Sequence, residues 1–272
     1  MKQRPVITMM TDFGNTDGFV GVMKGVILRI APEARIIDIS HELQPFAIAS
    51  AAFLNAWSFS YFPAGSVHLC VVDPGVGTKR RPLVAEIGGH FFVAPDNGLL
   101  MPTLDQAGSG RLFAAVHKRY WLEKVSNTFH GRDIFSPLAA HLANGVPMEE
   151  LGNEIHDPVR LPIKPVAVTH DRIECHICHI DRFGNLVTDL DQATFDTWAS
   201  RNGSRAEDVV IRLQQHRIHG ISKAYGEKRR GEFLAVFDGY DRLEIAAAGG
   251  HAASITGLGV ADTIHVIAAG ID

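Results

Sequence analysis

The sequence is poor in cysteine and has no excess of basic charge. It contains only Cys70, Cys175 and Cys178, an odd and low number that argues against a disulfide-stabilised fold and suits a reducing, cytoplasmic environment. Its 26 Lys and Arg residues are outnumbered by 30 Asp and Glu residues, which gives a net charge of −4. A protein that binds a phosphate backbone usually carries a basic patch, so we expect no nucleic-acid partner.

Long apolar segments are missing as well. No run of about 18 apolar residues occurs, so we expect no membrane span. Residues 1–10 have a charged start without a long apolar stretch, and they predict a first strand rather than a signal peptide. The chain also lacks internal repeats and low-complexity segments, which leaves an ordinary globular protein as the expectation.

The chain does contain enough apolar material for two domains. Hydrophobic residues make up 46% of its 272 residues, which excludes a disordered chain. Strand-like and helix-like segments alternate in the first half, which predicts an α/β domain with a central sheet flanked by helices. Asp17 is expected to cap the first helix. Strands are predicted at 6–10, 35–39, 67–72, 83–87 and 91–94, and helices at 19–30, 47–57 and 133–144.

A change in composition marks a domain boundary. Residues 157–165 contain Pro158, Pro162 and Pro165, which interrupt regular structure. We therefore predict an N-terminal α/β domain over residues 1–160 and a smaller C-terminal domain over residues 165–272. Short strands separated by polar turns indicate that the second domain is a β-barrel or sandwich. These strands are predicted at 172–180, 209–213, 233–237, 243–247 and 263–268, with a helix at 191–200.

The first candidate site follows the first predicted strand, at Thr11-Asp12-Phe13-Gly14. Open α/β sheets bind ligands outside the carboxyl ends of their strands. Asp12 could accept hydrogen bonds from two neighbouring hydroxyls there, as on a ribose diol. Alternatively, Asp12 is a turn residue that caps the next helix, and its spacing does not decide between the two.

The second candidate site is the segment VDPGVGTKR at residues 72–80. Asp73 ends an apolar strand, and a proline and two glycines then build a tight loop that lets the backbone approach a ligand. The segment matches neither the full phosphate-loop pattern nor a complete dinucleotide-binding pattern. The alternative is a hairpin turn in which Arg80 and its basic neighbours are solvated.

The third candidate site is TFHGRD at residues 128–133, just before a predicted helix. A helix N-terminus favours negative charge, and His130 could transfer a proton because its ordinary pKa lies near neutrality. The alternative is a surface histidine beside a helix cap at Asp133, since the chain has 14 histidines.

The fourth candidate site, IDRFGN at residues 180–185, opens the predicted second domain. The amide of Asn185 offers both a donor and an acceptor, which suits the edge of a purine, and Phe183 could pack on the face of a base. The alternative is a β-turn that uses Gly184 and Asn185.

The segment Cys175-His176-Ile177-Cys178-His179 has the composition of a metal or redox site. It lies in a strand pattern, in which Cys175 and Cys178 point to opposite faces, and the chain has no second cysteine pair. We therefore expect no metal there.

Taken in order, these segments resemble one family. They are similar to the adenosine-forming S-adenosyl-L-methionine hydrolases, also called S-adenosyl-L-methionine hydroxide adenosyltransferases, which are relatives of the bacterial fluorinase and chlorinase. The resemblance spans nearly the whole chain. The motifs that carry it are TDFG at 11–14, DISHEL at 38–43, VVDPGVGTKR at 71–80, APDNGLL at 94–100, FHGRDIF at 129–135 and IDRFGN at 180–185.

The resemblance implies an N-terminal α/β domain and a C-terminal β-barrel in a homotrimer, with the substrate between the N-domain of one subunit and the C-domain of the next. It implies hydrolysis of S-adenosyl-L-methionine to adenosine and L-methionine, by attack of an activated water or hydroxide on C5′, with no metal or other cofactor. Asp73, Arg80 and His130 would surround the nucleophilic water. The halogenating relatives lack this set, which favours water over halide.

The resemblance also implies how the substrate is held. Asp12 would bind the ribose hydroxyls, Asn185 the adenine and Asp181 the methionine amino group. The substrate-binding residues that it implies are Asp12, Phe46, Gly131, Asp181, Phe183, Asn185, Gly239 and Tyr240.

The chain departs from the family pattern near the expected amino-acid end of the substrate. Relatives commonly carry serines where this chain has residues 237–241, and an asparagine where it has Ala248. This difference motivates a rival hypothesis, a sensor that binds adenosyl compounds without catalysis. A second rival is a metal-dependent hydrolase with Asp12, Asp73 and His130 as ligands.

Overall fold

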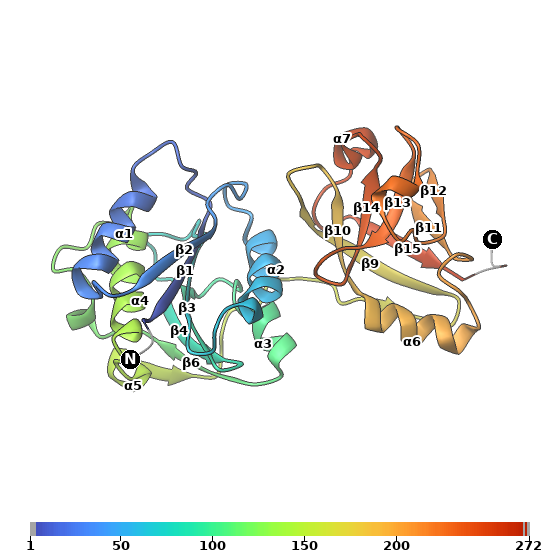
Figure 1. Cartoon of the computed structure of the whole chain (residues 1–272). Coiled ribbons are helices and arrows are strands. Elements are labelled where there is room, and N and C mark those ends of the chain that lie inside the picture. The colour runs from blue at the N-terminus through green and yellow to red at the C-terminus, as the bar shows by residue number, and fades with distance from the viewer. Residues whose placement is uncertain (1–3, 269, 271–272) are drawn as a thin grey trace. The chain divides into compact units, whose positions relative to one another are not determined.

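The computed structural model describes residues 4–268 and 270. The chain forms two compact units, Met1–Leu161 and Pro162–Asp272, shown from blue to green and from yellow to red in Figure 1. Each unit has its own hydrophobic core. Within the described residues, no helix combines the length and the apolar character needed to cross a membrane.

The first unit is built on a seven-stranded sheet in the order β2-β1-β3-β5-β4-β6-β7. The first four strands of this order run parallel, whereas β4, β6 and β7 join as antiparallel strands. β3 is buried throughout, because helices cover both faces of the sheet. The strands are β1 (Val6–Thr11), β2 (Arg35–Ser40), β3 (Val67–Val71), β4 (Pro82–Ile87), β5 (His90–Pro95), β6 (Gly110–Ala114) and β7 (Asn153–Ile155).

Helices α1 and α4 cover one face of this sheet, and α2 and α3 cover the other (Figure 1). Successive strand residues point to opposite faces, so Met9 packs in the α1 and α4 core while Met10 packs beneath α2. The helices are α1 (Phe19–Ile30), α2 (Ile48–Ser58), α3 (Met101–Ala107), α4 (Ser136–Ala143) and α5 (Met148–Leu151), with short turns η1 (Phe59–Tyr61), η2 (Lys118–Tyr120) and η3 (Gly131–Phe135).

Two candidate loops leave this sheet from neighbouring strand ends. β1 and β3 are adjacent and parallel, and Thr11 pairs with Val71 at their carboxyl ends. Asp12 therefore follows one strand and Asp73 the next, at the same edge of the sheet. This is the edge at which open α/β sheets bind their ligands.

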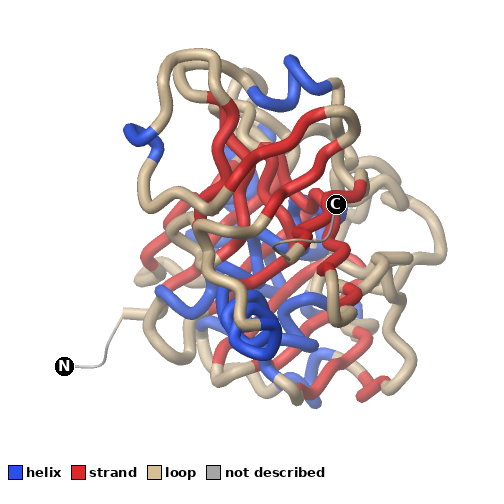
Figure 2. The backbone as a smooth tube through the Cα atoms, turned by 90° about the vertical axis from the view of Figure 1, so that its right-hand side faces the viewer, coloured by secondary structure: helices blue, strands red, loops and turns tan. Residues whose placement is uncertain are grey.

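The second unit is an eight-stranded antiparallel sheet in the order β12-β11-β15-β9-β10-β14-β13, with β8 beside β9. The end strands β12 and β13 contact each other, so the sheet forms a nearly closed barrel (Figure 2, strands in red). The strands are β8 (Ala167–Val168), β9 (Arg172–Ile180), β10 (Leu186–Asp191), β11 (Val210–Leu213), β12 (His216–His219), β13 (Phe233–Phe237), β14 (Arg242–Ala247) and β15 (Thr263–Ile267). Helices α6 (Gln192–Asn202) and α7 (Ala252–Thr256) and the turn η4 (Tyr225–Glu227) complete the unit.

The predicted fold class is confirmed, with an α/β first unit and a β-barrel second unit. One predicted cap is wrong, because the N-cap of α1 is Gly18 and no side chain caps this helix, so Asp17 does not do so. Asp191 instead caps α6, accepting a 2.7 Å hydrogen bond from the Thr194 N–H. The sequence analysis missed β6, β7, β8, β10, β12, α3 and α5, most of which are short or lie beside turn residues.

Candidate active site

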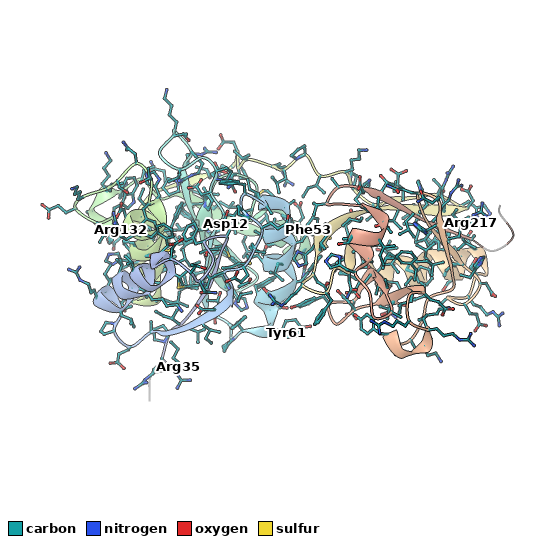
Figure 3. All side chains as sticks on the ribbon, turned by 90° about the horizontal axis from the view of Figure 1, so that it is seen from above. Asp12, Arg35, Phe53, Tyr61, Arg132 and Arg217 are labelled. Carbon is teal, nitrogen blue, oxygen red and sulfur yellow. The ribbon has the colours of Figure 1, made fainter. Side chains whose placement is uncertain are left out.

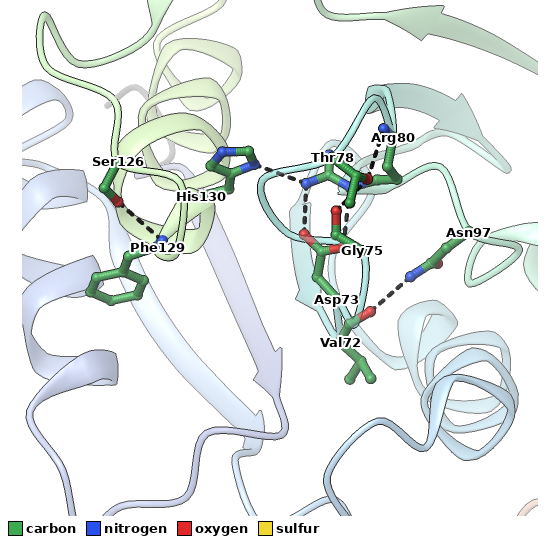
Figure 4. Close-up of polar contacts among 9 residues, drawn as sticks. All are labelled: Val72, Asp73, Gly75, Thr78, Arg80, Asn97, Ser126, Phe129 and His130. Atoms are coloured by element: carbon green, nitrogen blue, oxygen red, sulfur yellow. Dashed lines mark hydrogen bonds and ion pairs between the residues drawn. The ribbon is translucent and has the colours of Figure 1, made fainter.

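A buried ion pair joins the two ends of the loop that follows β3. The Arg80 guanidinium donates from Nε to Asp73 Oδ1 at 3.1 Å and from Nη2 to Asp73 Oδ2 at 2.6 Å (Figure 4). Only 4% of the Asp73 side chain and 7% of the Arg80 side chain are exposed. The alternative of a solvated basic turn is therefore wrong for Arg80, which makes a bidentate, charge-assisted contact.

The loop that carries this pair is held rigidly. The Thr78 hydroxyl donates to the Gly75 carbonyl at 2.7 Å, and the Asn97 amide donates to the Val72 carbonyl at 2.8 Å (Figure 4). Gly77 has a φ of +77°, and a Cβ there would lie 2.3 Å from the Asn127 carbonyl oxygen. Glycine at this position therefore lets the loop pack against the segment that leads to His130.

His130 completes a three-residue cluster with this pair. Its Nδ1 lies 3.1 Å from Arg80 Nη2 (Figure 4). A guanidinium only donates hydrogen bonds, so Nδ1 must accept and the proton of the neutral ring must sit on Nε2. Burial, followed by the charge of Arg80, lowers the pKa of His130 below its ordinary value of 6.5. His130 is therefore no isolated surface histidine, and it is neutral at neutral pH.

The helical backbone after His130 begins with a π-helical turn, η3, before α4 continues it. Asp133 lies inside this turn, fully buried, and does not cap the helix as expected. Its Oδ2 accepts hydrogen bonds from the Ser126 N–H and hydroxyl, both at 2.8 Å. Burial alone would raise the pKa of Asp133, but hydrogen bonds from Arg132 and Ser126 outweigh it and hold this pKa below its ordinary value. Asp133 thus fixes the backbone on both sides of His130.

One polar atom of the cluster lacks a protein partner. Arg80 Nη1 is buried, and it forms no hydrogen bond with any residue that the structure describes. Buried donors in proteins are almost always satisfied, by water or a ligand where no protein group serves. The cluster therefore offers a cationic N–H donor to a small oxygen-containing species beside Asp73.

Asp12 directly follows β1, and it lies near the middle of the first unit in the view of Figure 3. Its Oδ2 accepts a 2.8 Å hydrogen bond from the Phe46 N–H, and α1 receives no side-chain cap. Phe46 has a φ of +67°, unusual for a bulky residue, and 69% of its side chain is exposed. Strained residues of this kind cluster at ligand sites, so the structure favours the binding hypothesis for Asp12 over the helix cap.

In the second unit, residues 181–185 form the β-turn given above as the alternative. The Gly184 N–H donates to the Asp181 carbonyl at 3.0 Å, and Gly184 has a φ of +82°. Asp181 Oδ1 accepts the N–H groups of Phe183 and Asn185, and its Oδ2 accepts the Asn185 amide at 3.0 Å. Asn185 is buried, and its side-chain carbonyl oxygen has no hydrogen-bond partner among the described residues. Phe183 is 73% exposed.

One acidic residue of this unit, Glu244, was missed by the sequence analysis. Glu244 is buried on β14, and Tyr225 donates a 2.8 Å hydrogen bond to it. Burial, with the nearby charges of Asp181 and Asp238, raises the pKa of Glu244 to about 7 despite that hydrogen bond. A carboxylate in the middle of the apolar segment 243–247 is the signal that could have identified it.

Two remaining substrate-binding candidates, Gly239 and Tyr240, lie in the hairpin between β13 and β14. Asp238 Oδ1 accepts the Tyr240 N–H at 2.8 Å, and Tyr240 is 40% exposed.

Gly131 lies beside His130, where a Cβ would come within 3.1 Å of Met23 Sδ and 3.3 Å of the Phe13 ring. A larger residue at position 131 would therefore crowd the end of β1.

The described residues contain no group of three or more His, Cys, Asp or Glu side chains arranged to hold a metal ion. Cys70, Cys175 and Cys178 are all buried. Cys175 packs in the barrel core, and the Cys178 thiol donates to the Val187 carbonyl at 3.3 Å. Burial raises the pKa of all three thiols. Such thiols are inert, and they give the segment 175–179 no redox role.

Comparison with known proteins gives a consistent result for both units. Residues 7–152 match the SAM hydroxide adenosyltransferase N-terminal domain, and residues 175–265 match the SAM hydroxide adenosyltransferase C-terminal domain. An (R)-S-adenosyl-L-methionine hydrolase of Salinispora tropica is 36% identical over 272 residues, covering 98% of this chain and 100% of the relative. A fluorinase of Nocardia brasiliensis is more distant, at 28% identity over 69% of this chain and 72% of the relative.

A solved structure is similar over the same length. It is the crystal structure of an uncharacterized conserved protein from Thermotoga maritima, with a TM-score of 0.88 and 34% sequence identity. The match covers 96% of this chain and 99% of the other.

Proposed function

Because the chain belongs to the SAM hydroxide adenosyltransferase family, we propose that it hydrolyses S-adenosyl-L-methionine to adenosine and L-methionine. The observation that carries this proposal is the cluster formed by the buried Asp73–Arg80 ion pair and the half-buried His130, with an arginine N–H left for a water oxygen. The family match and the full-length similarity to an (R)-S-adenosyl-L-methionine hydrolase support the same substrate.

The reaction needs a positioned nucleophile more than a strong acid. The sulfonium of the substrate is already a good leaving group, so the water oxygen forms a bond to C5′ as the C5′–S bond breaks and its electron pair returns to sulfur. Holding water and ribose in line can contribute about 7–11 kcal/mol in favourable cases. In the proposed site, Arg80 Nη1 donates a hydrogen bond to the water oxygen. This contact keeps a lone pair of the water oxygen directed at C5′.

The geometry supports different roles for Asp73 and His130. The Nδ1 lone pair of His130 already accepts from Arg80, and its Nε2 carries the ring proton, so in this arrangement the ring has no free lone pair. We assign the proton of the attacking water to Asp73, whose carboxylate has further lone pairs beside Arg80. His130 then orients Arg80 and offers its Nε2–H as a donor.

The substrate-binding roles are proposals on the same footing. Asp12 uses Oδ2 on the Phe46 N–H and keeps Oδ1 for the ribose diol. The free carbonyl oxygen of Asn185 suits the adenine amino group, and the exposed rings of Phe46 and Phe183 suit a base or ribose face. Gly131, beside His130, would keep space for the substrate.

Asp181, Gly239 and Tyr240 remain candidates for the methionine end. The three hydrogen bonds that Asp181 accepts from its own turn leave it fewer lone pairs for an ammonium group than the sequence suggests. The buried carboxyl of Glu244 adds acidic character to the same unit.

We also propose the homotrimer that the resemblance implies, with the substrate site where copies of the chain meet. A cytoplasmic location is part of the same proposal, and the low number of cysteines is compatible with it. Sedimentation equilibrium tests the assembly, and a fully active monomer would contradict it.

Incubation of the purified protein with S-adenosyl-L-methionine, followed by chromatography, tests the proposed activity. We expect adenosine and methionine in equal amounts, and little 5′-chloroadenosine even at high chloride. Binding without turnover would instead support the adenosyl sensor suggested by the altered residues 237–241. Activity abolished by a chelator and restored by a divalent metal would support the metal-dependent rival.

A further inference from the structure

A line of polar contacts runs beneath the loop that carries Asp12. Lys24 Nζ on α1 lies 2.6 Å from Asp38 Oδ2, and Asp38 Oδ1 lies 3.1 Å from His41 Nε2. His41 Nδ1 lies 2.8 Å from the Thr11 hydroxyl, which accepts the Phe13 N–H at 3.3 Å. The line therefore connects the surface of α1, across the adjacent strands β2 and β1, to the backbone beside Asp12 (Figure 1).

The carboxylate of Asp38 beside His41 Nε2 favours the neutral tautomer with its proton on this nitrogen, so Nδ1 accepts the hydroxyl proton of Thr11. The Thr11 oxygen in turn accepts the Phe13 N–H. The contact between Nε2 and Asp38 is a close approach rather than an aligned hydrogen bond, since Nε2 has no partner that meets hydrogen-bond geometry among the described residues. Thr11 is fully buried and His41 is 3% exposed, so water does not compete for the Thr11–His41 hydrogen bond.

The same histidine joins two loops. Its carbonyl accepts the Gly14 N–H at 2.7 Å, and the side chains of Asn15 and Glu42 are hydrogen-bonded at 2.8 Å. Further along, the Phe46 N–H donates to Asp12 Oδ2 at 2.8 Å. Residues 11–15 and 41–46 are thus joined by four hydrogen bonds, of which the Thr11–His41 hydrogen bond is the buried one.

We infer that Thr11 and His41 are positioning residues that fix the direction of the Asp12 carboxylate toward a cis-diol ligand. The inference rests on the proposed function, because it takes the ribose of the adenosyl group as that ligand. A fully satisfied buried polar network makes the segments that it joins rigid, and a carboxylate that must receive two hydroxyls at once needs a fixed plane. The negative charge of Asp38, which is paired with Lys24, favours the His41 tautomer that this network requires.

The chain provides a matched control on the same strand. Thr8 is also fully buried on β1, and its hydroxyl lies 2.8 Å from the Nδ1 of another buried histidine, His68. Thr11→Val and Thr8→Val therefore remove equivalent hydroxyls without changing side-chain shape. Thr11→Ser keeps the hydroxyl and should restore function.

Calorimetric titration with adenosine and with 2′,3′-dideoxyadenosine tests the inference without requiring turnover. We expect Thr11→Val to bind adenosine about five- to tenfold more weakly than the wild type, with Thr8→Val and Thr11→Ser close to the wild type. Affinity for dideoxyadenosine, which has no diol, should be the same in all four proteins. Circular dichroism confirms that each variant is folded.

Two outcomes separate the inference from the proposed function. If the wild-type protein binds no adenosine, the proposed function fails and the inference fails with it. If the wild type binds adenosine but Thr11→Val loses no more affinity than Thr8→Val, or loses as much for dideoxyadenosine as for adenosine, the inference alone is overturned.

Discussion

Replacing Asp73 with asparagine changes the proposed proton acceptor with almost no change in shape. The Asp73 oxygens accept Arg80 Nε and Nη2 at 3.1 and 2.6 Å, and an asparagine can supply only one acceptor to this fork. Its NH₂ group would face an arginine N–H. Breaking a buried ion pair in this way costs about 3–5 kcal/mol of folding stability.

The Asp73→Asn substitution should lower the rate of catalysis by more than the loss of folding stability alone would cause. Loss of a positioned proton acceptor typically lowers a rate by about 10²- to 10⁴-fold, or about 3–5 kcal/mol of transition-state stabilisation. We therefore expect kcat and kcat/KM of Asp73→Asn to fall together by that factor, with KM nearly unchanged. Steady-state kinetics at a temperature where the variant is folded measures both constants.

A second Asp–Arg pair in the same unit, in which the aspartate is buried, supplies the control. Asp96 is 2% exposed at its side chain and lies 2.6 Å from Arg81 Nη2, but it also accepts the Val159 N–H and belongs to no proposed catalytic group. Asp96→Asn should lower the unfolding temperature while leaving kcat within about twofold of the wild type. If Asp73→Asn lowers kcat no more than Asp96→Asn does, Asp73 is a structural residue and the assigned role is wrong.

Further predictions concern pH and ligand affinity. Because the pKa of His130 lies below 6.5, kcat/KM should stay level above pH 6.5 and fall at more acidic pH, where a proton on Nδ1 is repelled by the Arg80 guanidinium. The His130→Gln variant should lose this fall at acidic pH in a pH–rate profile. Burial and the neighbouring His90 lower the pKa of His68 to about 3. In the unfolded chain His68 takes up a proton near pH 6.5, whereas in the folded chain it does not. The free energy of unfolding, measured by urea titration, should therefore fall by up to about 1.4 kcal/mol per pH unit from pH 6.5 toward pH 3. It should fall less steeply in His68→Gln. Asp12→Ala should weaken adenosine binding at least about tenfold by calorimetry. Tyr240→Ala should leave adenosine affinity unchanged and alter only that for S-adenosyl-L-methionine; equal losses would show that the residue 237–241 loop lies elsewhere.

The sequence predicts the main elements where periodicity is strong and fails where short segments depend on partners. The alternation of apolar strands with helices in residues 6–94 appears in the structure as β1 to β5 with α1 and α2. Asp17 has the right residue type for a helix cap, but the chain turns into α1 through Gly18 and leaves that side chain outside. β10 was missed because it begins directly at the Asn185 turn, and α3 because it spans only seven residues and includes a proline.

The candidate site shows the same division. Asp12, Asp73 and His130 could be singled out because polar residues at strand ends and helix starts follow from local spacing. The proximity of Arg80 and His130 could be expected only from the family resemblance and not from local spacing, since the contact joins residues 50 positions apart through the packing of two loops. The sequence also could not predict that His130 is neutral and that its Nδ1 accepts a hydrogen bond, because both depend on the direction of the Arg80 guanidinium. The Thr11–His41 network was likewise invisible, because a buried threonine in a strand usually signals only core packing.

Single turnover in ¹⁸O-labelled water is the most direct test of the central claim, that water held by Asp73 and Arg80 attacks C5′ of S-adenosyl-L-methionine. Mass spectrometry of the products should show one ¹⁸O atom in the 5′-hydroxyl of adenosine and none in methionine. Adenosine without the label, label in an amino-acid product, or a 5′-halogenated nucleoside as the main product would contradict the account.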